Sequence, residues 1–166
     1  MLRTDVALQA TPLLRLVINL HRSRQPRGTR THAGPTEERR LKKARIGQDI
    51  FREAVIDRWG GKCAVTECEI VPALEAAHIR WWSHKDTQAI RTSPENGLLL
   101  LRTLHSLFDL GLITFSDGGR MKISGYLDIQ ERKRLNIDGG MKLKQRLSTT
   151  QKRHMSFHRT HSFLDV

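Results

Sequence analysis

The sequence is short of cysteine, of aromatic residues and of long apolar runs, and each shortage narrows the class of protein. Two cysteines in 166 residues are too few for the disulfide framework of a small secreted domain. We therefore expect a reducing, cytoplasmic compartment. A length of 166 residues leaves room for one domain with a modest core, and an aromatic content of 5% suits a soluble domain with disordered ends. The apolar stretch "PLLRLVINL" contains Arg15 and falls far short of the roughly 20 apolar residues that a membrane-spanning helix needs, so no membrane partner is expected.

Acidic residues are scarce relative to basic ones. The chain has 29 Lys and Arg against 17 Asp and Glu, a net charge of +12. An excess of this size is typical of proteins that bind nucleic acid, although a solvated lysine-rich surface without a partner has the same composition. Residues 1–45 carry a net charge of +8, and their segment "HRSRQPRGTRTHAGP" has no apolar run. We therefore expect a basic disordered arm over 1–34 that contacts phosphates, followed by a folded domain over 35–166.

The patterning of residues 35–166 indicates an α+β domain. Pro35 begins a helical pattern that stops at the glycines 60–61, with an expected break at Gly47. "GLLLL" at 97–101 is typical of a buried strand. The other expected elements, in chain order, are a short strand at 63–65, an extended run at 74–82, a polar loop at 83–96, a helix at 103–111, a hairpin at 112–124 and a terminal helix at 149–164.

Residues 96–109, "NGLLLLRTLHSLFD", hold the first candidate site. His105 and Asp109 are four residues apart on the predicted helix, so both side chains face the same way and can chelate one ion. His78 lies on the extended run before the loop, and a strand–loop–strand–helix unit would set it opposite this pair. Taken singly, His78 on an apolar strand is more typical of a core histidine, and His105 and Asp109 are typical of a helix-surface pair.

Two longer segments carry a specific resemblance. "AHIRWW" and "NGLLLLRTLHSLFDLGLITF" resemble the HNH endonuclease family, in the branch whose cores read Glu/Asp-Ala-Ala-His-Ile, Asn-Gly-Leu and His-x-x-Phe-Asp. The family letters fall on His78, Asn96 and His105, which the resemblance implies as the catalytic set. It covers roughly residues 46–164. It implies a ββα-metal nuclease core at 63–116, with flanking helices and a C-terminal β-hairpin.

The resemblance also implies a reaction, the metal-dependent hydrolysis of DNA phosphodiester bonds. His78 would be the general base, since an unperturbed imidazole pKa near 6.5 suits that role at neutral pH. His105 and Asp109 would hold a single divalent metal ion that acts as a Lewis acid. Mg²⁺ or Mn²⁺ is favoured, and the mixed nitrogen and oxygen ligands also admit Zn²⁺ or Ni²⁺. Asn96 would tie the loop to the strands rather than bind the ion.

The sequence departs from the family pattern at two places. Many relatives carry a metal ligand directly before the base, where this chain has Ala77. Glu75 lies two residues earlier on the same strand face, about 6.6 Å along the strand, and is either a third metal ligand or a surface residue paired with an arginine. Many relatives also have two cysteine pairs around a zinc ion, whereas Cys63 and Cys68 form one. We expect that pair to pack as core, with a zinc knuckle completed by histidines as the other reading.

A second class of function stays open at this point. A nucleic-acid-binding module with a degenerate HNH or zinc-knuckle core, lacking catalysis, would also explain the charge. Ala77 favours this alternative, whereas the intact His78, Asn96 and His105 favour the enzyme. Restriction-type defence, mobile-element nucleases and toxin-like nucleases all use such a core. The target sequence and the oligomeric state cannot be read from the chain.

Overall fold

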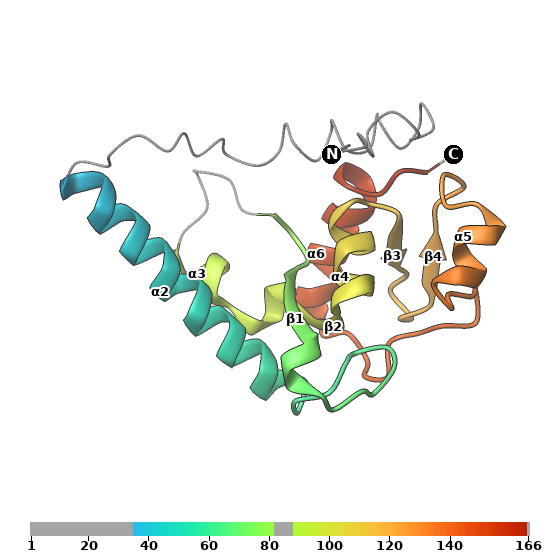
Figure 1. The fold of residues 1–166 in the computed structure, drawn as a ribbon, viewed down its shortest axis with the longest axis horizontal. Helices are drawn as coiled ribbons and strands as arrows, with labels where there is room; N and C mark the ends of the chain where they lie inside the picture. The colour runs from blue at the N-terminus through green and yellow to red at the C-terminus, as the bar shows by residue number, and fades with distance from the viewer. Residues whose placement is uncertain (1–34, 82–87, 166) are drawn as a thin grey trace, which may run out of the picture. The chain divides into compact units, whose positions relative to one another are not determined.

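The computed structural model describes residues 35–81 and 88–165. The arm expected over 1–34 and the loop residues 82–87 lie outside the described residues. The described part combines helices with two separate antiparallel sheets of two strands each, which confirms the predicted α+β class (Figure 1).

The helix α2 runs without interruption from Pro35 to Arg58, so the predicted break at Gly47 is wrong. Glycine keeps its backbone N–H, and its cost of about 1 kcal/mol relative to alanine is small enough for packing of the neighbouring turns to offset. That packing comes from Phe51 and Val55, which are buried in the core. Neither α2 nor any other helix within the described ranges is long and apolar enough to cross a membrane.

The first sheet pairs β1 (Leu74–His78) with β2 (Gly97–Leu101). The strands are antiparallel, with Leu74 opposite Leu101 and His78 opposite Gly97. The three central leucines of β2, residues 98–100, are fully buried, which requires cover on both faces of the strand. The helices α2 and α4 (Arg102–Asp109) both contact β2 and supply that cover.

The segment at 63–65 is a turn, so the predicted strand there is wrong. The Ala64 N–H does donate to the Leu99 carbonyl, at 2.7 Å. The chain then reverses, because the N–H of Cys63 bonds to the carbonyl of Cys68 and Glu67 adopts a left-handed φ of 60°. A single backbone hydrogen bond to β2 does not make this segment a strand.

The helix α4 follows β2 directly and is amphipathic. Leu104, Leu107 and Phe108 are buried, whereas the positions of His105 and Asp109 lie on the more open side. The chain before β2 was predicted as a polar loop, but part of it is helical. The short helices that precede the two strands are η2 (Val71–Ala73), α3 (Gln88–Thr92) and η3 (Pro94–Asn96).

The second sheet pairs β3 (Ile113–Phe115) with β4 (Met121–Ile123), within the region predicted as a hairpin. Two helices follow it, α5 (Ile129–Arg134) and α6 (Thr149–His161), so the hairpin is not the last element of the chain (Figure 1). The helix α5 was not predicted. His158 of α6 is a buried core residue whose ring nitrogens lie 2.9 Å from the Thr114 hydroxyl and 3.1 Å from the Phe108 carbonyl.

Alanine at Gly97 and alanine at Gly47 should change stability in opposite directions. A Cβ at Gly97 would lie 2.3 Å from Cγ2 of Val55 and 3.0 Å from Cζ of Phe51, and such overpacking costs about 1–3 kcal/mol. A Cβ at Gly47 meets no heavy atom within 4 Å, so Gly47→Ala should stabilise α2 by about 0.5–1 kcal/mol. Denaturant midpoints measure both effects. A Gly97→Ala variant as stable as the wild type would contradict the close packing of β2 on α2.

Candidate active site

Asn96 closes the end of the first sheet with its side chain. Its Oδ1 accepts a hydrogen bond from the Arg80 N–H at 2.9 Å, and its Nδ2 donates to the Arg80 carbonyl at 3.0 Å. Its own carbonyl accepts from the Ile79 N–H at 2.9 Å. These bonds continue the pairing of the two chains beyond His78, where β1 ends. Asn96 is fully buried and its amide contacts the backbone at both ends, so it holds the strand end in place.

The turn that presents Asn96 is itself anchored from several elements. Ser93 caps it, because its hydroxyl accepts from the Glu95 N–H at 3.3 Å and its carbonyl accepts from the Asn96 N–H at 3.0 Å. The Glu95 carboxylate accepts from Arg58 of α2 at 3.2 Å and from the hydroxyl of Ser148, the residue that caps α6. The position of Asn96 is thus fixed by α2, η3 and the start of α6 together.

His78, the last residue of β1, is a half-buried imidazole with a defined tautomer. Its ring stacks on Phe51 of α2 with centroids 3.7 Å apart and an interplanar angle of 9°. Its Nε2 lies 2.9 Å from the Arg91 carbonyl, which can only accept, so Nε2 carries the proton and Nδ1 is the acceptor.

Burial sets the protonation state of His78. Desolvation lowers its pKa below the usual value of 6.5, the bond to the Arg91 carbonyl opposes that shift, and the charge of nearby His105 lowers the pKa further. The ring is therefore neutral at pH 7. A neutral imidazole with an acceptor nitrogen has the state that a general base needs.

Glu75, His105 and Asp109 form a row near His78, named here the acidic row. Oε2 of Glu75 lies 3.1 Å from Nδ1 of His105, and Oδ2 of Asp109 lies 3.6 Å from Nε2 of the same ring. The i, i+4 spacing on α4 brings His105 and Asp109 together as predicted. Glu75 joins them from β1, across the contact between that strand and α4.

Of the two readings of Glu75 from the sequence, the pairing with an arginine is present, and the metal-ligand reading stays a prediction. Its Oε1 accepts from Nε of Arg102 at 2.7 Å, so it does pair with an arginine. Its other oxygen faces His105. Ala77, at the position where relatives carry a ligand, is fully buried in the core and offers no donor atom.

The acidic row has donor atoms that suit a divalent metal ion, but these atoms do not converge on one point. Within 35–81 and 88–165, no three His, Cys, Asp or Glu side chains converge on one point as metal ligands do. The two carboxylates instead face opposite nitrogens of one imidazole. Carboxylate oxygens and imidazole nitrogen are nevertheless suitable donors for Mg²⁺, Mn²⁺ or Zn²⁺, and the three side chains are 20% to 39% exposed, within reach of an ion.

The cysteine pair has no disulfide. Cys63 is buried in the core and Cys68 packs against that core. The Thr66 N–H points at the Cys63 sulfur at 3.5 Å. In the part of the chain that the structure describes, no further Cys or His completes a zinc site around them.

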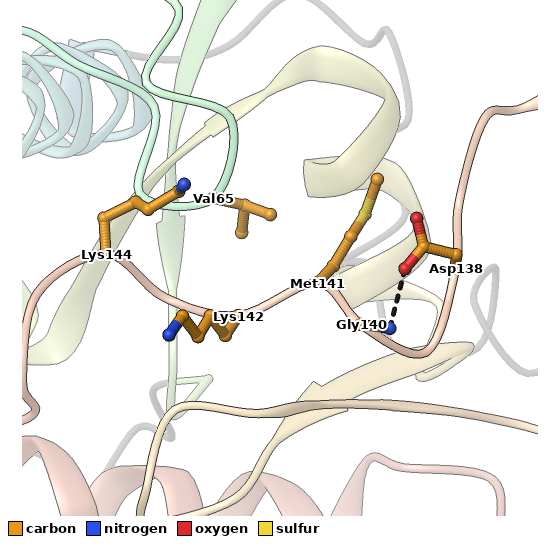
Figure 2. A pocket seen from close by; sticks show the side chains of 6 residues that line it. All are labelled: Val65, Asp138, Gly140, Met141, Lys142 and Lys144. Carbon is orange, nitrogen blue, oxygen red and sulfur yellow. Dashed lines mark hydrogen bonds between the residues drawn. The ribbon is translucent and has the colours of Figure 1, made fainter.

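A surface hollow lies away from the acidic row. Figure 2 shows it between the turn at Val65 and the segment 138–144, with Met141, Lys142 and Lys144 on its wall. None of its lining residues belongs to the acidic row or contacts His78. The hollow therefore plays no part in the site described above.

Three contacts of the site were missed by sequence reasoning. The Phe51 ring under His78 lies 27 residues earlier on α2, and its apolar spacing predicted only a core position. The Arg91 carbonyl comes from the stretch predicted as a polar loop, and a backbone acceptor leaves no signal in a sequence. Arg102 starts α4 beside Glu75, and only an expectation of some arginine near that carboxylate pointed to it.

Comparison with known protein families gives one finding. The family model described as HNH endonuclease matches residues 63–116. The matched region contains β1, β2, α4 and β3, and so includes His78, Asn96 and the acidic row. A search of curated proteins gave no match.

The imidazole of His78 should titrate below pH 6.5 in the folded protein with EDTA present, measured from its NMR shifts. Because its folded pKa is lowered, His78 contributes stability that is present above pH 6.5 and lost as the pH falls through the folded pKa. Phe51→Leu admits water to the ring and should move the midpoint back up. A midpoint at or above 6.5 in the wild type would show that the ring is not desolvated.

Proposed function

The chain belongs to the HNH endonuclease family through residues 63–116, and from that premise we propose that it is a metal-dependent endonuclease that hydrolyses DNA phosphodiester bonds. The observation that supports this most is the pairing of a neutral, fixed imidazole with the acidic row. His78 is the general base, and Glu75, His105 and Asp109 hold a single divalent ion. Asn96 positions the base without touching the ion.

In this proposal His78 activates the attacking water. Its Nδ1 accepts the proton of the water as the oxygen attacks phosphorus, which leaves the ring as an imidazolium. The Nε2–H bond to the Arg91 carbonyl fixes the tautomer and favours that charged ring. Stacking on Phe51 holds the plane of the ring, so the base does not have to be oriented in each turnover.

In this proposal the acidic row binds the metal ion. A divalent ion bound there would polarise a phosphoryl oxygen and stabilise the leaving 3′ oxygen. Glu75 supplies the carboxylate that Ala77 cannot, from two residues earlier on β1. Arg102 pairs with the second carboxylate oxygen of Glu75. Two carboxylates and one imidazole favour Mg²⁺ or Mn²⁺ and admit Zn²⁺ or Ni²⁺. With an ion bound, β1, β2 and α4 would form a ββα-metal site.

DNA is the proposed substrate because the family acts on nucleic acid and the chain carries a charge of +12. The six basic residues of the arm over 1–34 would add phosphate contacts outside the domain. Two free cysteines suit a reducing compartment, so we place the reaction in the cytoplasm.

Replacement of the base tests the proposal. His78→Ala should lower the rate of plasmid nicking by about 10²- to 10⁴-fold, because the water loses its proton acceptor, while DNA affinity changes little. His154→Ala on α6 is the matched histidine control and should cleave like the wild type. Nicking by His78→Ala at the wild-type rate would remove this residue from the mechanism. DNA binding without cleavage by the wild type would instead support a non-catalytic binding module.

Replacement of Glu75 tests the metal site. Glu75→Gln should weaken Mn²⁺ binding in calorimetry and lower cleavage, with partial recovery at high Mn²⁺, and His105→Ala and Asp109→Ala should weaken it as well. Glu131→Gln is the control, since Glu131 pairs with Arg134 on α5 much as Glu75 pairs with Arg102. If Glu75→Gln binds Mn²⁺ like the control variant, Glu75 is a surface residue that pairs only with Arg102.

A further inference from the structure

A cluster of aromatic and cationic side chains lies on the surface where β1 leads into the loop. The Trp81 ring meets the ring of Phe157 of α6 edge-on, with centroids 5.8 Å apart. The guanidinium of Arg80 lies 4.8 Å from the centre of the same Phe157 ring, and His161 stacks on it at 4.0 Å. These four residues are named here the aromatic cluster.

Trp81 is unusual because it is both exposed and firmly held. It is 48% exposed, and within 35–81 and 88–165 it is the only exposed Trp, Tyr or Phe. Its backbone follows Arg80 directly, and Asn96 bonds both polar groups of the Arg80 backbone. An aromatic ring left in water forfeits the free energy of burial, and a fixed one offers its area to a partner at little entropic cost.

The aromatic cluster lies close to His78 along the chain. Trp81 follows His78 by three residues, and three residues span at most about 10 Å. That distance is comparable to the separation of neighbouring nucleotides in an extended strand. A strand whose phosphate reaches His78 could therefore bring an adjacent base to Trp81.

The charge around Trp81 suits a nucleic acid strand. The helix α6 has no acidic residue, and Lys152 and Arg153 are exposed on it. Arg80 adds a third cation beside the aromatic rings. Aromatic rings flanked by cations are the means by which proteins hold single strands, because every base has a face that stacks.

Resting on the proposed function, we propose that Trp81 stacks on an unpaired DNA base beside the phosphate that His78 attacks. In a duplex both faces of a base are already stacked on its neighbours, so this contact is open only to single-stranded, gapped or flapped DNA. The nuclease thus prefers DNA with unpaired nucleotides at the cleavage point, and Trp81 is the source of that preference.

Binding of a fluorescent oligonucleotide tests this inference without cleavage. With EDTA present, wild-type protein should bind gapped DNA that carries 2-aminopurine in the gap and quench its fluorescence by stacking. Trp81→Ala should lose the quench and bind the gapped DNA roughly five- to a hundredfold more weakly. Trp81→Tyr should keep most of both. Ile129→Ala, which removes another exposed apolar side chain, on α5, should bind like the wild type.

The outcomes separate this inference from the proposed function. Equal quenching and affinity in Trp81→Ala and the wild type would overturn the stacking contact, whatever the protein cleaves. An equal loss of affinity for fully paired DNA in Trp81→Ala would overturn the preference for unpaired bases. Metal-dependent cleavage of duplex plasmid, assayed separately, decides the proposed function alone.

Discussion

The site depends on the two hydrogen bonds between the Asn96 side chain and the Arg80 backbone. They continue the pairing of β1 and β2 past the last residue of β1, where a regular ladder would end. His78 is thereby held at a strand end that would otherwise fray, and Trp81 is held just beyond it. Since Asn96 is fully buried, removing its amide would break both bonds at a cost of about 1–3 kcal/mol each. One side chain therefore links the stability of the first sheet to the position of the base.

His78 and the acidic row differ in their surroundings, although Glu75 lies on the same strand as His78. His78 is packed against Phe51 of α2 and stays neutral because water is largely kept from it. The side chains of the acidic row are 20% to 39% exposed, which leaves them within reach of an ion. The amphipathic α4 makes this division possible, because its leucines and Phe108 close the core while His105 and Asp109 face outward. In the proposed mechanism, a largely desolvated base and a partly exposed ion site then lie beside one substrate phosphate.

The sequence predicted the parts of the site that have a local periodicity or a motif. The strand at 97–101 was readable from its leucine run, and the pairing of His105 with Asp109 followed from helical spacing. The glycine of α2 and the turn after Cys63 were misread, because packing overrides one unfavourable residue and a single backbone reversal ends a strand. The Phe51 stack and the Arg91 carbonyl are contacts between distant segments, one of them through backbone alone, and no pattern in one sequence encodes them.

The central claim is that this domain cuts DNA with the help of a divalent ion. The most direct measurement is the conversion of supercoiled plasmid to nicked circles by the purified chain, with Mg²⁺ or Mn²⁺ titrated in and EDTA added at the end. The account predicts nicking that rises with the ion, stops with EDTA and returns when excess ion is restored. Nicking that persists unchanged in EDTA, or plasmid that stays supercoiled with every divalent ion while the protein binds it, would contradict the account.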